Sequence, residues 1–290
     1  MDFTEETAAQ AVVDSFADTP DPRLRELLSK LVPHLHAYVR ETRLTLPEWE
    51  KAIEFLTAVG QKSDEFRQEF ILLSDVLGIS MLTETINGQQ EGTESTVLGP
   101  FHMTESPKRE LGESIDLLGG KVPCVVVGRI LAPDGSSLPG ASLDVWQCTE
   151  EGFYDVQQPD LQPAGNGRGL FTTDTGGGFW FRTVVPTHYP IPTDGPVGEL
   201  LSATKRHAYR PAHIHFIAQA PGHTTLTTHI FVAGGPYLDS DAVFAVKQSL
   251  VADFTEVTDP AMATEYGVTV PFRRAEIDLV LESTAARNAS

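Results

Sequence analysis

The sequence predicts an α+β fold in which an N-terminal helical domain, residues 1–92, precedes a β-sandwich domain with irregular loops, residues 93–290. Apolar residues before Gly92 recur at three- and four-residue steps, the period of a helix with one packed face. After Lys121, short runs of β-branched and aromatic residues alternate with turn-forming clusters. At 290 residues the chain can form one large domain or a core domain with a smaller partner.

The first long helix is predicted from a stripe of apolar side chains. Pro33 interrupts this stripe, and because proline lacks a donor and clashes with the preceding turn, we expect it to kink or divide the helix. Thr45 and Glu48 form a capping-box pattern with Pro47 in the first turn, which predicts a further helix through about Val59. The stripe of the first long helix, which Pro33 interrupts, consists of Leu24, Leu27, Leu28, Leu31, Leu35 and Val39.

Another helix is predicted over residues 64–86, with Phe66, Phe70, Leu73, Leu77 and Met81 on one side. Such apolar stripes indicate packing in a core or a dimer interface.

The second half of the chain is predicted to be a β-domain. Turns are expected at 133–135 and 176–178, and one late helix at 240–254. The number of strands suits a sandwich. The expected strands are 124–131, 142–148, 169–173, 178–184, 213–219, 225–232 and 276–281.

The composition of the chain argues against nucleic-acid binding and membrane association as its main function. The formal net charge of −19 would repel nucleic-acid phosphates and anionic lipid, so an anionic substrate would need local cations. The N-terminal residues lack the pattern of a signal peptide, and no apolar run is long enough for a membrane span. Cys124 and Cys148 lie in apolar stretches, which favours buried free thiols over a disulfide. We therefore expect a cytoplasmic protein.

A His-x-His pair is the sharpest local signal for chemistry. His213 and His215 are two residues apart in a predicted strand, so their side chains share a face and lie about 6.6 Å apart along it. Two imidazoles so placed can bind one metal ion. The alternative is one buried and one surface histidine.

The remaining ligands would decide which metal binds. A cupin-like Fe(II) site needs a carboxylate shortly after the histidines, where this chain has Gln219. Tyrosinate is a hard anionic donor that favours Fe(III), and Tyr154, Tyr189 and Tyr209 are candidates. Each tyrosine taken alone is more often a packing residue with a satisfied hydroxyl than a metal ligand.

Three segments together resemble the intradiol ring-cleavage dioxygenases: DVWQCTEEGFYDVQ, FWFRTVVPTHYPIPTDGPVG and RPAHIHF. The resemblance covers roughly residues 60–255 and implies one Fe(III) per chain, bound by Tyr154, Tyr189, His213 and His215. A wider resemblance to the hydroxyquinol-cleaving branch rests on EFILLSDVLGISML, STVLGPF, YPIPTDGPVG and GGPYLDSDAVF.

The resemblance implies that the protein cleaves hydroxyquinol (benzene-1,2,4-triol) with O2 in aromatic hydrocarbon catabolism. The product would be 3-hydroxy-cis,cis-muconate, which tautomerises to maleylacetate. Tyr189 would take up a substrate proton, and Arg210 would stabilise negative charge on the ring, unless Arg210 only forms a salt bridge. Two alternatives remain: a catechol or chlorocatechol 1,2-dioxygenase, and a non-catalytic β-sandwich binding module with structural zinc.

The same resemblance implies a pocket wall and a quaternary structure. Asp75 would accept a hydrogen bond from the third hydroxyl of hydroxyquinol, or else cap a helix or form an ion pair. Leu98 stands where some relatives have a larger aromatic residue, and His229 where many have glutamine; His229 is either a donor behind the ligands or an ordinary strand residue. A homodimer is implied through the N-terminal helices, with an apolar tunnel that can hold a phospholipid. The implied wall comprises Leu72, Asp75, Val97, Leu98, Gly99, Pro100, Phe101, Ile191, Pro192, Arg210 and Val243.

Overall fold

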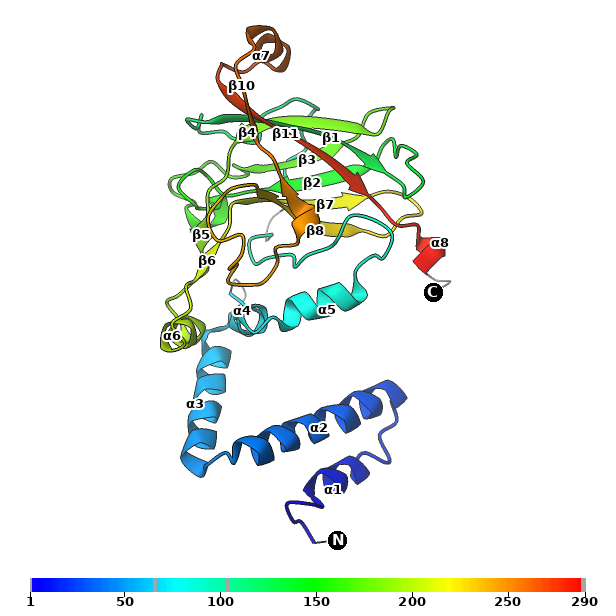
Figure 1. The fold of residues 1–290 in the computed structure, drawn as a ribbon, viewed down its shortest axis with the longest axis vertical. Helices are drawn as coiled ribbons and strands as arrows, with labels where there is room; N and C mark the ends of the chain where they lie inside the picture. The colour runs from blue at the N-terminus through cyan, green and yellow to red at the C-terminus, as the bar shows by residue number, and fades with distance from the viewer. Residues whose placement is uncertain (1, 65–66, 103–104, 288–290) are drawn as a thin grey trace. The chain divides into compact units, whose positions relative to one another are not determined.

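The computed structural model describes residues 2–64, 67–102 and 105–287 (Figure 1). The chain divides into two compact units, Met1–Ala58 and Val59–Ser290. Helices come first and the β-sandwich follows, so the predicted α+β class is confirmed. The unit boundary precedes residue 92, and the helices α4 (Glu69–Val76) and α5 (Ile79–Asn87) belong to the second unit.

The first unit contains α1 (Ala8–Asp14), α2 (Pro22–Thr42) and most of α3 (Leu46–Lys62). The expected division of α2 at Pro33 is wrong, because the helix continues through this residue. Its ends are well capped: the Asp21 carboxylate accepts from two backbone N–H groups, and Arg43 closes the C-terminus in the left-handed region. One missing donor therefore does not end a helix of 21 residues.

The start of α3 agrees with the prediction, and its end at Lys62 lies beyond Val59. The Glu48 carboxylate accepts hydrogen bonds from the backbone N–H of Thr45 at 2.9 Å and from its hydroxyl at 2.8 Å. Glutamate at this position therefore satisfies a donor at the helix start.

The single helix expected over 64–86 is wrong, because the chain forms α4 and α5 instead. Gly78 separates them with φ of 74°, a conformation that favours glycine. Of the expected stripe, Leu73 and Met81 are buried whereas Phe70 and Leu77 are exposed, and Phe66 lies outside the described residues.

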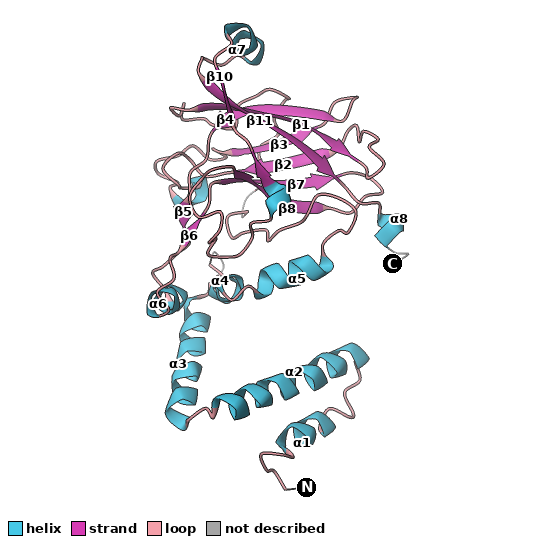
Figure 2. Cartoon of the chain, viewed as in Figure 1, coloured by secondary structure: helices cyan, strands magenta, loops and turns pink. Residues whose placement is uncertain are grey.

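Two sheets form the sandwich (Figure 2). One has the order β10-β11-β1-β4, with β1 parallel to β11 and antiparallel to β4. The other has the order β3-β2-β7-β8-β9, which places β7 at its centre. The bounds in the first sheet are β1 Pro123–Leu131, β4 Gly178–Val184, β10 Thr255–Val257 and β11 Phe272–Val280. Those in the second are β2 Ser142–Trp146, β3 Arg168–Thr172, β7 His213–Gln219, β8 Leu226–Val232 and β9 Val251–Ala252.

Aromatic residues fill the space between the sheets. Phe181 on β4 packs against Phe171 on β3 and Phe216 on β7, with ring centroids 5.3 and 6.5 Å apart. Cys124 and Cys148 are buried free thiols, as predicted. Burial raises the pKa of each thiol to about 12.

The helix expected over 240–254 is wrong. This segment contains a loop, the 3-10 turn η2 (Gln248–Leu250) and β9. The Asp241 carboxylate accepts from the backbone N–H groups of Val243 and Ala245, and Phe244 has φ of 60°, so local side-chain bonds replace helical ones.

Several short elements were not predicted from the sequence. They include β10, the turn η1 (Asp155–Gln157), the paired strands β5 (Tyr189–Pro190) and β6 (Tyr209–Arg210), and the helices α6 (Pro196–Ala203), α7 (Pro260–Tyr266) and α8 (Thr284–Arg287). Among the described residues, no helix combines the length and apolarity that a membrane span requires.

Candidate metal centre and substrate pocket

The two histidines of β7 share one buried site. Their Nε2 atoms lie 3.2 Å apart and both residues are buried, so the alternative of one buried and one surface histidine is wrong. The Nδ1 atom of His213 lies 2.7 Å from the Pro211 carbonyl oxygen, which can only accept. His213 therefore carries its proton on Nδ1 and presents the Nε2 lone pair to the site.

Two tyrosines from distant parts of the chain meet these histidines. Tyr154 immediately precedes η1, and Tyr189 begins β5. Their hydroxyl oxygens are 3.1 Å apart; that of Tyr154 lies 2.9 Å from Nε2 of His215, and that of Tyr189 lies 3.3 Å from Nε2 of His213. Tyr209, the third candidate, is 36% exposed and stacks on Tyr237 instead.

The electrostatics of this cluster fit a bound cation. Burial raises the pKa of Tyr154 and of Tyr189, and it lowers the pKa of His213 and of His215. Without a cation the cluster therefore holds neutral phenols and neutral imidazoles. A multivalent metal ion would stabilise the phenolates, so two anionic oxygens and two neutral nitrogens form a donor set suited to a hard cation.

Arg210 faces the same cluster and forms an ion pair with Asp241. Its Nη1 atom lies 3.4 Å from Nε2 of both His213 and His229, and its Nε donates to Asp241 at 3.2 Å. Burial by itself would lower the pKa of Arg210, but Asp241 and the two buried tyrosines raise it. The guanidinium therefore remains charged beside the site, held in place by the Asp241 carboxylate.

His229 is a third buried histidine in the site. On β8 it is paired with His215 in strand register, and the two ring centroids are 4.2 Å apart. A guanidinium can only donate, so Nε2 of His229 accepts from Arg210 and Nδ1 carries the proton. That proton is donated to the Thr96 hydroxyl, which fixes the orientation of the ring.

Part of the expected pocket wall contacts the cluster directly. The ring of Phe101 stacks on Tyr154 with centroids 4.6 Å apart, and it makes a T-shaped contact with the Tyr189 ring at 6.4 Å. Gly99, with φ of 79°, approaches His215 so closely that an added Cβ would lie 3.0 Å from its Cε1 atom. A side chain at residue 99 would therefore displace a candidate ligand.

The other expected wall residues differ in burial. Asp75 on α4 is buried, and its Oδ1 atom has no hydrogen-bond partner among the described residues. Burial raises the pKa of the Asp75 carboxyl, against a lowering effect of Ser80 and Arg210. Leu72, Ile191 and Val243 are buried, Val97 and Pro192 are half-buried, and Leu98 and Pro100 are exposed.

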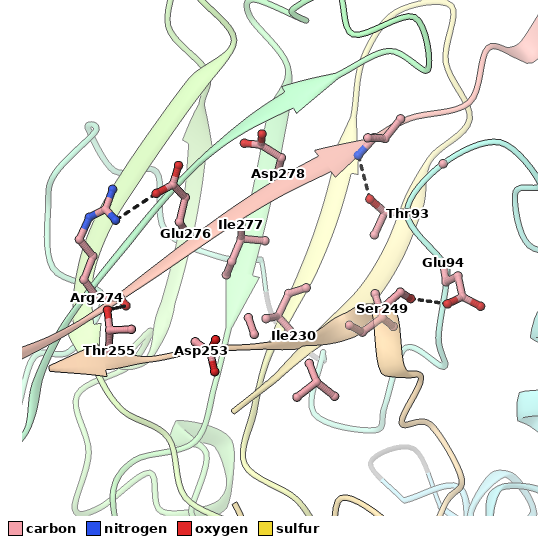
Figure 3. A pocket seen from close by; sticks show the side chains of 15 residues that line it. Thr93, Glu94, Ile230, Ser249, Asp253, Thr255, Arg274, Glu276, Ile277 and Asp278 are labelled. Atoms are coloured by element: carbon pink, nitrogen blue, oxygen red, sulfur yellow. Dashed lines mark hydrogen bonds and ion pairs between the residues drawn. The ribbon is translucent and has the colours of Figure 1, made fainter. Parts of the chain in front are cut away.

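A separate cavity of about 630 Å³ lies beside β9 and β11 (Figure 3). Its wall includes Glu94, Asp253, Glu276 and Asp278, with Arg274 paired to Glu276 at 3.0 Å. It shares no residue with the expected site, and its acidic wall does not favour an anionic ligand.

Two supporting residues were missed in the sequence. Asp241 holds Arg210, and Thr96 holds His229. Both lie inside segments on which the family resemblance rests, but no local pattern reveals their partners, which are 31 and 133 residues away.

Comparisons with known proteins agree with this geometry. The family models "Dioxygenase" and "Catechol dioxygenase N terminus" match residues 99–281 and 21–94. A hydroxyquinol 1,2-dioxygenase of Rhizobium sp. is 52% identical, over 91% of this chain and 90% of that protein. An intradiol ring-cleavage dioxygenase of Aspergillus niger is 40% identical, over 97% of this chain and 86% of the other.

A solved structure is similar throughout. The hydroxyquinol 1,2-dioxygenase of Pseudomonas putida DLL-E4 superposes with a TM-score of 0.90 at 48% identity, covering 96% of this chain and 98% of that chain. The extent of these matches, together with the buried tyrosine and histidine cluster, shows that the chain belongs to the intradiol ring-cleavage dioxygenase family.

Proposed function

We propose that this dioxygenase cleaves hydroxyquinol with O2 between its vicinal hydroxylated carbons, giving 3-hydroxy-cis,cis-muconate and, after tautomerisation, maleylacetate. The observation that carries the proposal is the buried cluster of two phenol oxygens and two imidazole nitrogens. The substrate is supported by relatives named for hydroxyquinol and 6-chlorohydroxyquinol cleavage, at 52% and 49% identity.

The metal is proposed to be one Fe(III) per chain, held by Tyr154, Tyr189, His213 and His215. Two hard phenolate oxygens support the ferric state over Fe(II) or zinc. When bound, the ion would supply Lewis acidity and a template for the vicinal substrate hydroxyls.

Two side chains beside the metal are proposed to take part in the reaction, one by accepting a proton and one by stabilising negative charge. Tyr189 is proposed as the catalytic proton acceptor for a substrate hydroxyl, because its oxygen lies among the other donors within hydrogen-bond reach. Arg210 is proposed to stabilise negative charge on the ring, since its guanidinium is buried and held by Asp241.

Purified protein offered hydroxyquinol, catechol and chlorocatechols should show the highest kcat/KM for hydroxyquinol. Metal analysis should find iron, and tyrosinate-to-Fe(III) charge transfer should colour the protein wine-red. A zinc-bound or metal-free binding module would be colourless. Preference for plain catechol would reject the proposed substrate but not the intradiol reaction.

Asp75 is proposed to select the third hydroxyl of the substrate. Its buried Oδ1 atom has no partner in the part of the chain that the structure describes, and it would accept a hydrogen bond that catechol cannot offer. The proposed wall around the ring is Leu72, Val97, Leu98, Gly99, Pro100, Phe101, Ile191, Pro192, Arg210 and Val243.

Replacing Asp75 by leucine should lower kcat/KM for hydroxyquinol by about 10–100-fold, because one hydrogen bond to a charged group is lost. The value for catechol should change little. Steady-state kinetics on both substrates would measure the ratio, with Asp75→Asn as a control that retains an acceptor oxygen. An unchanged ratio in Asp75→Leu would remove Asp75 from substrate selection.

The quaternary structure is proposed to be a homodimer formed by the helical part, residues 1–92, with residues 93–290 as the catalytic part. All of α2 is described and none of its residues is buried, so the leucine stripe exposes apolar surface that a second chain could cover. A phospholipid is proposed to share this surface.

Light scattering should give twice the chain mass of 31.6 kDa. Lipid extraction followed by mass spectrometry would detect the phospholipid. A monomer at micromolar concentration would contradict the dimer. A cytoplasmic location is also proposed, and the two free thiols support it.

A further inference from the structure

Arg168, at the start of β3, is a buried guanidinium that the proposed chemistry does not use. Its side chain is 1% exposed. Its Nε donates to Oδ1 of Asp155 at 2.8 Å, and its Nη2 lies 2.7 Å from the same oxygen. The same Nη2 donates to the carbonyl oxygen of Phe101 at 2.8 Å. One planar group therefore joins two segments that are 54 residues apart in the sequence, from 101 to 155.

The two joined segments carry the rings that pack beside the donor cluster. Asp155 directly follows Tyr154, and its other oxygen accepts from the backbone N–H of Gly165 at 3.0 Å. The Phe101 ring stacks on the Tyr154 ring with an interplanar angle of 24°. Arg168 thus holds the main chain beside both members of this stacked pair.

The backbone of Arg168 is itself fixed to the sheet that carries the histidines. Arg168 is paired with Trp146 in strand register, and Trp146 is paired on its other side with His215. The rings of Trp146 and His215 stack 4.5 Å apart at an interplanar angle of 11°. A short rigid path therefore connects the guanidinium, the Tyr154 turn and a histidine of the cluster.

We propose that Arg168 is a positioning residue that, through Asp155 and the Phe101 carbonyl, sets the placement of the Tyr154 and Phe101 rings in the pocket. The inference rests on the proposed function in taking Tyr154 as a metal ligand. The planar fork of arginine is required because it reaches a carboxylate and a carbonyl at once. A lysine ammonium keeps the charge but cannot reproduce this geometry.

Arg168→Lys is the informative variant because Asp155 keeps a cationic partner. Relative to wild type, we expect kcat/KM to fall by about 10–100-fold and iron release to a chelator to accelerate by about as much, as when groups that orient metal ligands are lost. The visible tyrosinate band should shift. In the metal-free protein, the near-ultraviolet circular dichroism should change as the Phe101–Tyr154 stack loosens.

Arg129→Lys is the matched control. Arg129 forms an Arg–Asp pair with Asp278 at 2.7 Å, but on the exposed surface between β1 and β11. This variant should match wild type in all four measurements. The inference would be overturned if Arg168→Lys also matched wild type in the visible tyrosinate band, in iron release and in kcat/KM. A lower melting temperature as the only change would mean that the Arg168–Asp155 pair has a purely structural role.

A second variant covers the case in which Arg168→Lys does not fold. Arg168→Met combined with Asp155→Leu removes both buried charges, and apolar replacement of a whole buried pair is often tolerated. The inference expects a folded protein with an altered dichroism spectrum and faster iron release; wild-type values for both would overturn it. Wild-type protein without iron or colour would instead refute the proposed function, and the dichroism of the metal-free variants would still test Arg168.

Discussion

Tyr154→Phe should lose tightly bound metal and nearly all ring cleavage. The substitution removes one oxygen and retains the ring that stacks on Phe101, so packing changes little. The lost oxygen lies 2.9 Å from Nε2 of His215 and 3.1 Å from the Tyr189 hydroxyl, at the centre of the proposed ligand set. Loss of a partner behind a metal ligand costs about 10–100-fold, so loss of the ligand itself should cost more than about 100-fold in kcat/KM.

Iron content, the visible spectrum and turnover should all change together in Tyr154→Phe. Tyr38→Phe, at an exposed tyrosine of α2, provides the same chemical change away from the cluster and should behave as wild type. Should Tyr154→Phe keep its iron, colour and turnover, the proposed ligand set would be wrong.

Arg210→Met should lower both activity and stability. Loss of a preorganised charge that stabilises a developing anion typically costs about 10²–10³-fold in kcat. Asp241 would keep its buried carboxylate without its guanidinium partner, which should destabilise the fold by about 3–5 kcal/mol. Urea titration and steady-state kinetics at a temperature where the variant is folded would separate the two effects.

Arg210→Lys should recover most of the stability and only part of the activity. It restores a cation for Asp241, but a single ammonium cannot also replace the contact with Nε2 of His229. If Arg210→Met lost stability while the folded fraction kept wild-type kcat, Arg210 would act only as a salt-bridge partner.

Local geometry explains which parts of the site could be predicted. The spacing of His213 and His215 in a strand places both side chains on one face, and the structure brings their Nε2 atoms together. The tyrosines are 61 and 24 residues away from their histidine partners. Their place in the site was therefore predicted from the motif resemblance and not from sequence spacing. That resemblance did not reveal Arg168, whose partners are Asp155 at the start of η1 and the carbonyl of Phe101 in a loop.

The errors in the predicted fold also arise from interactions that local sequence patterns do not show. Periodicity over 64–86 could not show that Gly78 would adopt a left-handed conformation and separate α4 from α5. Asp241 diverts residues 240–254 from a helix because its carboxylate binds nearby N–H groups and Arg210 at the same time. Such tertiary hydrogen bonds override local propensity and leave little trace in hydrophobic patterns.

Cys148 packs with Trp146, Tyr154 and Tyr189, beside the place where dioxygen would react. The thiolate is the form of sulfur that oxidants attack, and a pKa of about 12 leaves almost none of it near neutral pH. Sulfenic acid formation is therefore suppressed at this cysteine.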